Sequence, residues 1–583
     1  MTSDRFGVAV VLGLLGVLVG VPFLLSAGRG DAPEADARRL IVVTPHTQQI
    51  RTEFGRAFAS WHEREFGESV AIDYRTPGGT SEIRRQLQAQ FRAAAVGGQV
   101  SLAGEGGGTA VVEPGVIGFD LMFGGGSYDH GTLKSGVRVK VDGQDVDVPM
   151  STPADFTQAE LDAIFGPNAV GTELLYDPEQ YWIGTALSSF GIIFNRPLLA
   201  RLGLDEPDAW QDLTDPRLLG WIALADPRSS GSITTTFDSI LGNLGWDEGW
   251  RVLRAMCGNS RSITNSSTKP PLDVGAGEAA MGLAIDFYGR GQAQVLAEAG
   301  DDRLGYAEPT GAVYIDADPV SVIRGGPDPE LANRFVRFML TEEAQALWQF
   351  PALRRDDAAD NPLGPDGERM GPDANELRRM PVRRVMYERY FEHFKDQVQP
   401  FEIASKVSNP GWRTGVQMMM GGFGIDSADE CRKAWGVIAS AERTPGFPPD
   451  VLAEMRRTFY SFPDTPVTLV QSHPRFGVLS DQAKAALPAD RMLRLDTLRV
   501  LLETDEIAAS ATALAELRSL ADAPPVALPF LQDTYRAIRN EWRNPTVEAR
   551  LKIEYTRYFR DAYARIIEMY EQNRTAIAAA EEN

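Results

Sequence analysis

The chain has few of the residues on which metal centres and thiol chemistry depend. Among 583 residues there are two cysteines and five histidines. There is no Cys-x-x-Cys pair, and the histidines show no ligand spacing such as His-Glu-x-x-His. A Gly-x-Ser-x-Gly nucleophile motif and a Walker A lysine are also lacking. We therefore expect no cofactor and no enzyme, although a catalytic triad scattered along the sequence would leave no such signature.

Basic residues are also in deficit, since 58 Lys and Arg stand against 80 Asp and Glu, a formal net charge of -22. No basic stripe offsets this acidity, so nucleic acid binding is not expected. The composition is otherwise that of a globular protein, with 43% apolar and 24% charged residues. A chain of this length exceeds what one hydrophobic core usually organises, which predicts two or more domains.

The two cysteines, Cys257 and Cys431, are far apart in the sequence. Two isolated cysteines without a short spacing do not require a disulfide, although an exported location would permit one. We favour two buried thiols, with a disulfide as the alternative.

One long apolar run is present, at residues 6–27, and it carries no charge. About 20 apolar residues span a bilayer, whereas the apolar part of a signal peptide has about 7–15. The length favours an uncleaved membrane anchor at 1–28, with a cleaved signal peptide as the alternative. Either interpretation places the rest of the chain outside the cytoplasm, after a polar linker at 29–39 that contains Pro33.

Strand and helix patterns alternate from Leu40 onwards. An apolar segment at 40–44 precedes a helical pattern with Phe54, Phe58 and Trp61, and a second strand pattern follows at 70–76. Thr80 and Ser81 then stand where helix caps are expected. This order predicts a parallel sheet with crossover helices.

Several predicted strands end in Gly, Ser or Thr ahead of a predicted helix. Ligands of open α/β sheets bind at the carboxyl ends of strands, and helix N-termini attract anions. Each such turn on its own is equally typical of an ordinary capped helix. The candidate ligand-binding residues are His46, Thr47, Gly79, Thr80, Ser81, Gly125, Gly126, Ser188, Ser189, Ser232, Thr234, Thr235, Asp286, Tyr288 and Asp316.

The stretch Gly277–Arg290, GEAAMGLAIDFYGR, resembles ferric-ion-binding proteins of bacterial ABC importers. Residues 313–350 resemble a later passage of the same proteins, in which the chain returns to its first lobe. The order of segments over residues 40–441 is similar to that of type 2 periplasmic solute-binding proteins.

This resemblance implies an α/β fold of two lobes with a ligand cleft between them. It places lobe 1 at 40–184, lobe 2 at 185–312, and a return to lobe 1 at 313–440. Crossover strands are expected near 184–195 and 313–324, and a loop insertion at 356–376. Residues 441–583 would form a mostly helical C-terminal extension, whose tyrosines 555, 558, 563 and 570 are more typical of packing than of ligand binding.

The resemblance also bears on the cargo. Ferric-binding relatives hold iron with two adjacent tyrosines and an early histidine, positions that are Phe287, Tyr288 and His46 here. His46 and Tyr288 would be the ligands if iron were bound, but a phenyl ring cannot replace a phenolate. Together with the hydroxyl-rich turns, this favours a small anionic solute: a phosphorylated or phosphonate compound, or an iron chelate.

The function implied is that of a monomeric, extracytoplasmic binding protein that closes around its solute and delivers it to an ABC permease. A membrane-tethered ligand-sensing or scaffold protein with the same fold is the alternative, since the anchor and the helical tail exceed what delivery requires. An enzyme on this scaffold is a third.

Overall fold

The computed structural model describes residues 37–103, 109–141, 143–309, 312–408, 410–467 and 525–581. The apolar run at 6–27, and with it the predicted anchor, lies outside these residues. Within the described ranges, no helix is both long enough and apolar enough to cross a membrane.

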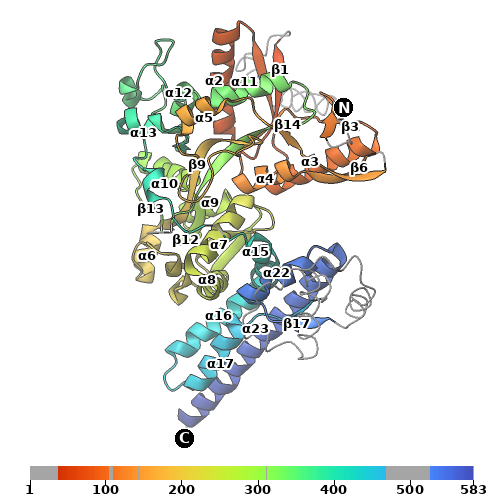
Figure 1. Cartoon of the computed structure of the whole chain (residues 1–583). Coiled ribbons are helices and arrows are strands. Elements are labelled where there is room, and N and C mark those ends of the chain that lie inside the picture. The colour runs from red at the N-terminus through yellow and green to blue at the C-terminus, as the bar shows by residue number, and fades with distance from the viewer. Residues whose placement is uncertain are drawn as a thin grey trace, which may run out of the picture.

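Lobe 1 is built on the predicted alternation of strands and helices (Figure 1). Strand β1 pairs in parallel with β2 on one side and with β5 on the other. Helices α2 and α11 bury Phe54, Phe58 and Phe335 in a common core, and Phe54 and Phe58 belong to the helical pattern that the sequence predicts. The elements of this lobe are β1 (Arg38–Val43), α2 (Gln48–Phe66), β2 (Val70–Arg75), α3 (Thr80–Val96), β3 (Val100–Ala103), β4 (Thr109–Val112), β5 (Leu121–Phe123), α4 (Ser127–Ser135), β6 (Val137–Val141), β7 (Gln144–Val148), β8 (Ser151–Thr152), α5 (Gln158–Phe165), α11 (Pro329–Met339) and α12 (Glu342–Gln349).

Lobe 2 repeats the same architecture around β10, which pairs in parallel with β11 and β12. Its helices α7 and α8 carry an apolar core that includes Phe237, Leu241 and Leu253. The elements of this lobe are α6 (Arg196–Leu202), η1 (Trp210–Thr214), η2 (Pro216–Leu218), β10 (Ile222–Ala225), α7 (Gly231–Leu244), α8 (Trp246–Gly258), β11 (Ser260–Thr264), α9 (Lys269–Gly275), β12 (Met281–Ile285), α10 (Asp286–Glu298) and β13 (Leu304–Ala307).

Two long buried strands, β9 (Ile183–Asn195) and β14 (Ile315–Ile323), join the lobes. The first half of β9 pairs with β14, and its second half pairs with β12 and β13 of lobe 2. One sheet with the order β11-β10-β12-β9-β14-β5-β1-β2 therefore runs through both lobes. The two-lobed α/β fold is confirmed, and the crossing strands occupy the stretches predicted for them.

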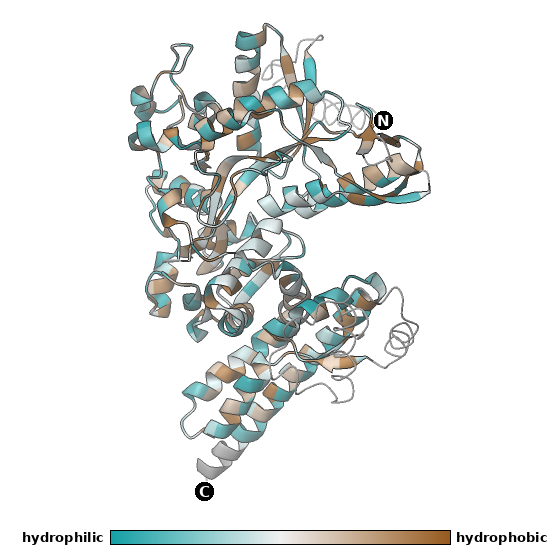
Figure 2. Ribbon diagram, in the orientation of Figure 1, coloured by the Kyte–Doolittle hydropathy of each residue, from teal (hydrophilic) through white to brown (hydrophobic). Residues whose placement is uncertain are grey.

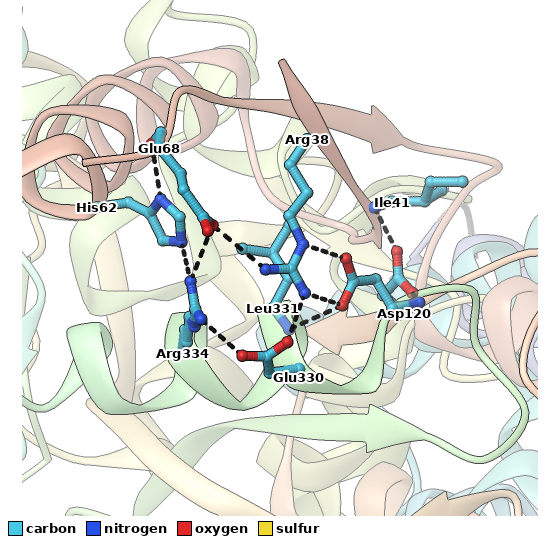
Figure 3. A network of polar contacts seen from close by, with 9 residues as sticks. Arg38, Ile41, His62, Glu68, Asp120, Glu330, Leu331 and Arg334 are labelled. Atoms are coloured by element: carbon cyan, nitrogen blue, oxygen red, sulfur yellow. Dashed lines mark hydrogen bonds and ion pairs between the residues drawn. The ribbon is translucent and has the colours of Figure 1, made fainter. Parts of the chain in front are cut away.

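Lobe 1 is closed by a polar network between the N-terminal strand and the returning helix α11 (Figure 3). Arg38 donates from Nε to Asp328 Oδ2 at 2.6 Å and from Nη2 to Glu330 Oε2 at 2.9 Å. Arg334 extends the network from Nη1 to Glu68 Oε2 at 3.1 Å and to the ring of His62. The network ties together residues almost 300 positions apart and so joins the N-terminal strand of lobe 1 to the returning helix.

The sequence misplaced the start of α3. The helix begins at Thr80, its N-cap is Gly79, and no side chain caps it. Thr80 and Ser81 are therefore helical residues with buried side chains, because the chain leaves its extended course at Gly79. The first-turn amides of α3 are left without a side-chain cap.

The predicted loop insertion at 356–376 is irregular but fixed to lobe 1. The buried carboxylate of Glu53 in α2 accepts hydrogen bonds from the backbone amides of Asp373 at 2.7 Å and Asn375 at 2.9 Å. The short elements of this part are η3 (Asp356–Asp360), β15 (Met380–Pro381), α13 (Val385–Arg389), η4 (Phe391–His393) and α14 (Pro400–Ile403).

A helical module follows and packs against lobe 2, at the bottom of the view in Figure 1. Its members are α15 (Arg413–Met420), η5 (Gly421–Ile425), α16 (Ala428–Arg443), α17 (Pro449–Tyr460), β16 (Thr465–Val467), β17 (Val526–Leu528), α22 (Gln532–Glu541) and α23 (Pro545–Glu581). Side chains of lobe 2 and of this module form one continuous hydrophobic cluster. In Figure 2 the long helix α23 carries alternating apolar and polar residues, as a helix with one buried face does.

The aromatic and thiol side chains of the module serve packing. Tyr555 and Tyr563 are buried, and the Tyr563 hydroxyl donates to the Phe423 carbonyl at 2.9 Å. Cys257 of α8 and Cys431 of α16 are two separate buried thiols, as the sequence favoured.

Candidate functional site

A cavity of about 460 Å³ lies between the lobes, where the carboxyl ends of the strands of both lobes meet. Lobe 1 contributes the turns after β1, β2 and β5, and lobe 2 those after β10, β11 and β12. Residues of the crossing strands β9 and β14 complete the wall. The lining side chains include Ser188 and Phe190 of β9, Asp316 of β14 and, from the returning chain, Arg379.

Ten of the fifteen candidate residues line this cavity. They come from both lobes and from the crossing strands, so the fold brings together positions up to 270 residues apart. The ten are His46, Gly79, Thr80, Gly125, Gly126, Ser188, Ser232, Thr235, Tyr288 and Asp316.

Two of the other five candidates do not line the cavity, for reasons of periodicity. Ser188 and Ser189 are neighbours on a strand and point to opposite faces, so only Ser188 lines the cavity while Ser189 bonds Glu308. Thr234 is one position from Thr235 on helix α7, and its hydroxyl donates to the Pro227 carbonyl at 2.6 Å.

The remaining three have other surroundings. Thr47 is the N-cap of α2 and lines a neighbouring cavity of about 360 Å³. Ser81 is buried in the first turn of α3, away from the lining. Asp286 is buried and accepts a hydrogen bond from the Phe287 amide at 2.8 Å, with Arg290 Nη1 3.7 Å from its carboxylate.

Helices from both lobes begin at the cavity wall. The first residues of α3, α7 and α10 line it, as do the glycines that precede α4. In α7 the side chain of Ser230 caps only the amide of Ile233, at 3.4 Å. Each helix N-terminus presents unpaired backbone N–H groups and a partial positive charge. Their convergence makes the cavity favourable for an anion.

The approach to α4 depends on glycine. Gly124 and Gly125 have φ of 93° and 116°, which side-chain-bearing residues rarely adopt. A Cβ at Gly124 would overlap the His46 ring, and one at Gly125 would lie 2.8 Å from the methyl group of Thr80. Two carboxylates of the crossing strand β14 fix this turn: Asp318 Oδ1 accepts from Gly125 N at 2.7 Å, and Asp316 Oδ2 from Ser127 N at 3.1 Å.

Arg379 is a charged cavity residue that sequence reasoning missed. Its side chain is buried, forms an ion pair with Asp318 and stacks over the Phe287 ring with 4.1 Å from Cζ to the ring centroid. Among the described residues its Nε has no hydrogen-bond partner. Burial lowers the pKa of Arg379 to about 10, an effect that the charges of Asp286 and Tyr288 oppose. The guanidinium therefore stays protonated at neutral pH and gives the cavity wall a fixed positive charge.

The residue in the sequence that could have indicated a nearby cation is Phe287, whose ring contacts Arg379. A phenyl ring at the position of a metal-ligating tyrosine offers its face to a cation, which a metal site does not require. The presence of phenylalanine instead of tyrosine at position 287 could therefore have indicated a cation beside its ring.

Burial shifts three titratable groups of the wall, Asp316, His46 and Tyr288, towards their neutral forms. Burial raises the pKa of Asp316 to about 7, against the hydrogen bonds from Ser127, and its Oδ1 has no hydrogen-bond partner among the described residues. Burial and then the charge of Arg379 hold the pKa of His46 well below its usual range. Burial also raises the pKa of Tyr288, so its phenol stays protonated.

This electrostatic setting does not suit a bare ferric ion. A neutral phenol is a weaker ligand than the phenolate that ferric iron prefers. The guanidinium of Arg379 lies on the ring beside Tyr288 and opposes a bound cation. Within the described ranges, no cluster of three or more His, Cys, Asp or Glu side chains has the arrangement of a metal site.

The lobes touch where α3 faces α7. A Cβ placed on Gly79 would lie 3.1 Å from the Ser229 carbonyl oxygen. One on Gly231 would lie 2.5 Å from Thr80 Oγ1 and 2.6 Å from Asp129 Oδ2. The lobes are therefore in contact beside the cavity, where glycines allow their backbones to approach.

Comparison with known proteins finds similarity to one class over part of the chain. Residues 154–379 match the family model described as bacterial extracellular solute-binding protein. An uncharacterized protein of Haemophilus influenzae is 31% identical over 161 residues, which cover 27% of this chain and 44% of the relative. The phosphoglycerate transport regulatory protein PgtC of Salmonella typhimurium is 28% identical over 167 residues, 28% of this chain and 40% of the relative. The chain thus spans less than half the length of the curated relatives it matches.

Solved structures of similar fold are at lower identity. The periplasmic binding protein AfuA of Actinobacillus pleuropneumoniae, with fructose-6-phosphate bound, is 19% identical with a TM-score of 0.39, covering 53% of this chain and 81% of that one. Iron-bound HitA of Pseudomonas aeruginosa is 16% identical with a TM-score of 0.42, covering 68% and 99%. Over residues 154–379 the chain is similar to the bacterial extracellular solute-binding proteins, the class that the sequence resemblance indicated.

Proposed function

We propose that this protein captures a small anionic solute in the cavity between its lobes, outside the cytoplasm, and delivers it to an ABC permease. The solute would be a phosphorylated or phosphonate compound. The ligand-binding residues would be those of the candidate set that line the cavity, together with Arg379.

The observation that carries this proposal is the buried, protonated Arg379 in a wall formed by helix N-termini. Such a guanidinium is costly to bury unless a negative charge compensates it. Asp318 supplies one charge, and the Nε of Arg379 remains available for a second partner. An anionic group at this point would receive charge-assisted hydrogen bonds from the guanidinium and from the amides of α3 and α7.

Polar atoms in the same wall that have no hydrogen-bond partner among the described residues favour a solute that also carries hydroxyl groups. Thr80 Oγ1, Ser188 Oγ and Asp316 Oδ1 have no hydrogen-bond partner within the described residues. A buried polar atom without a partner costs free energy that a ligand hydroxyl would recover. A sugar phosphate or a phosphorylated hydroxy acid meets both requirements. The phosphorylated compounds in the names of AfuA with fructose-6-phosphate and of PgtC are compatible with this chemistry.

An iron chelate is the remaining anionic alternative, whereas bare ferric ion is disfavoured by Arg379 and by the protonated phenol of Tyr288. A second candidate function, membrane-tethered sensing, is favoured by one observation: the helical module shares a hydrophobic core with lobe 2. A lobe that moves on ligand binding would carry this module with it.

A thermal-shift screen of the full chain tests the proposal. The panel holds fructose 6-phosphate, 3-phosphoglycerate, an alkyl phosphonate and ferric citrate, each beside its uncharged or metal-free counterpart. A ligand at 100 times its Kd stabilises the native state by about 2.7 kcal/mol, enough for a clear rise in Tm. We expect a rise with a phosphorylated or phosphonate compound only. A rise with the uncharged counterparts, or with bare ferric ion alone, would contradict the proposal.

A further inference from the structure

We propose that Arg413 belongs to the binding machinery although it lies beyond the matched family segment: it orients the α7 end of the cavity and clasps Tyr128 of lobe 1 when the lobes close. Its effect on solute affinity rests on the proposed function, whereas its effect on lobe closure does not.

Arg413 is the first residue of α15 and is buried against α7 of lobe 2. Its Nη2 donates to the Gly231 carbonyl at 2.9 Å, and its Nη1 donates to the hydroxyl of Thr235. Thr235 lines the cavity, and Gly231 is the residue at which the lobes touch. The guanidinium therefore fixes one cavity hydroxyl and the first turn of the helix that presents it.

The other face of the guanidinium meets lobe 1. Cζ of Arg413 lies 4.2 Å from the centroid of the Tyr128 ring, in the first turn of α4. The next residue, Asp129, is buried and brings its carboxylate against Gly231 at the N-terminus of α7. A cation on an aromatic face and an anion at a helix N-terminus are both attractive contacts. The first turn of α4 is thus matched in charge to the surface formed by α7 and Arg413.

Arg413 has no carboxylate within ion-pair distance in the part of the chain that the structure describes. Its charge does act on two buried carboxyls that face it, because it lowers the pKa of Asp316 and of Asp238, which burial raises. A cation that has no carboxylate close to it among the described residues, and whose charge lowers the pKa of Asp316 in the cavity wall, also favours an anionic solute there.

Arg413 moves with lobe 2. The amide of Trp412 donates to Asp238 of α7 at 2.8 Å, and the amide of Gly415 donates to the Tyr535 hydroxyl of α22 at 3.0 Å. When the lobes separate, the bonds from Arg413 to α7 persist and the stacking on Tyr128 is lost. A contact made only in the closed state shifts the equilibrium towards that state. The helical module, which holds α15 in place, therefore contributes to closure.

The first experiment measures lobe separation without any solute. Val96→Cys in α3 and Leu272→Cys in α9 give one exposed labelling site on each lobe, while the native thiols are buried. Single-molecule FRET between them reports the closed fraction of the full chain. Tyr128 is half exposed, so its replacement does not threaten folding.

We expect Tyr128→Leu to reduce the ratio of closed to open molecules about three- to tenfold, as for the loss of a partly exposed cation–π contact. Tyr128→Phe keeps the aromatic face and restores the wild-type ratio. Tyr181→Leu removes a ring that Lys134 covers within lobe 1 alone, and leaves the ratio unchanged. Equal closed fractions for wild type, Tyr128→Leu and Arg413→Met would overturn the proposal.

The second experiment measures affinity for fructose 6-phosphate by calorimetry. Arg413→Met weakens binding more than Tyr128→Leu, because it also releases the Thr235 hydroxyl and removes a charge. Arg413→Lys keeps the charge and recovers part of the affinity. If fructose 6-phosphate fails to bind the wild type, the proposed solute is wrong, and the FRET measurement still decides the role of Arg413.

Discussion

Two buried arginines lie in different parts of the molecule, and their surroundings differ. Arg379 lines the cavity and pairs with Asp318, and its Nε has no hydrogen-bond partner among the described residues. Arg254 of α8 lies where lobe 2 meets the helical module; within the described ranges its Nη1 donates to the Ser461 carbonyl at 3.2 Å, and its Nε and Nη2 have no partner. Aromatic rings surround it at 4.5–5.5 Å from Cζ: Phe423, Phe459, Phe462, Phe559 and Tyr563.

The surroundings of these two arginines distinguish a buried charge that serves packing from one that can bind a ligand. Around Arg254 the rings contact the cation from several directions, so the site is already filled and a ligand has no access. Around Arg379 one face is covered by Phe287 and another is open to the cavity. A buried cation thus indicates a binding site only where part of its donor set faces open space.

The largest expected effect is on stability, at Arg254. Arg254→Ala leaves a cavity among the five rings and removes their common cation, and we expect a loss of about 3–5 kcal/mol in the free energy of unfolding. Arg251→Ala is the matched control on the same helix, because Arg251 stacks on Tyr460 at 4.6 Å while half exposed. Its cost is under about 1 kcal/mol. Urea denaturation measures both, and equal costs would show that the aromatic cage has no special role.

Arg379 tests the opposite property. Arg379→Met removes the fixed positive charge, and we expect affinity for fructose 6-phosphate to fall by about 2–4 kcal/mol, or roughly 30- to 1,000-fold. Arg378→Met is the control, since Arg378 faces Asp396 and does not line the cavity. Calorimetry compares the two, with circular dichroism to establish that both fold. An Arg379→Met protein that binds like the wild type would remove the electrostatic basis of the proposed function.

Gly231 tests whether the closed approach of the lobes is required. A methyl group there meets Thr80 and Asp129 of lobe 1, although alanine suits the helix well. We expect Gly231→Ala to weaken solute binding about tenfold, or about 1.4 kcal/mol, without loss of stability. Gly131→Ala on α4 has open space around it and should leave affinity unchanged. Tighter binding by Gly231→Ala would mean that the solute prefers a more open cleft.

The smallest expected effect is the pH dependence set by Asp316. Its folded-state pKa is about 7, raised by burial from 3.8, so the carboxyl ionises as the pH rises through 7 and then repels an anion. We expect affinity for fructose 6-phosphate to fall about fivefold between pH 6 and pH 8, a change of about 1 kcal/mol. The Asp316→Asn protein experiences the same titration of the ligand but lacks the titration of Asp316. Its affinity should therefore fall less than that of the wild type between pH 6 and pH 8.

The same group affects stability in a defined direction. A carboxyl whose folded-state pKa is raised contributes stability below its unfolded pKa, and this contribution is lost as the pH rises through about 7. The ligand-free Asp316→Asn protein should therefore have a higher Tm than the wild type at pH 8. At pH 3 the two values should converge, and a lower Tm for the variant at pH 8 would contradict the assigned shift.

The sequence predicted what depends on local pattern. The alternation from β1 to α3 and the buried face of α2 follow from periodicity, which neighbouring residues determine. Because ligands of open α/β sheets bind at the carboxyl ends of strands, the sequence also predicted that distant turns meet in one place. Ten candidates line the resulting cavity. Whether these residues bind the solute remains a prediction, as do the boundaries of the domains.

What the sequence missed depends on the path of the chain in space. Arg379 and Arg413 reach the cleft only after the chain has returned through both lobes, and no local pattern marks them. Neighbouring pairs such as Ser188 and Ser189 were both chosen because small residues near a strand end do not reveal which face they take. From the sequence, Phe287 indicated only that iron is not the ligand. In the structure its ring also packs against the guanidinium of Arg379.

The most direct test of the central claim compares two ligands that differ only by a phosphate. Calorimetry of the full chain with fructose 6-phosphate and with fructose measures what the charge contributes at the cavity. We expect the phosphorylated sugar alone to bind the wild type, with an affinity roughly 30- to 1,000-fold lower in Arg379→Met. Equal binding of both sugars, or binding of the phosphorylated sugar that is as tight in Arg379→Met as in the wild type, would contradict the proposed function.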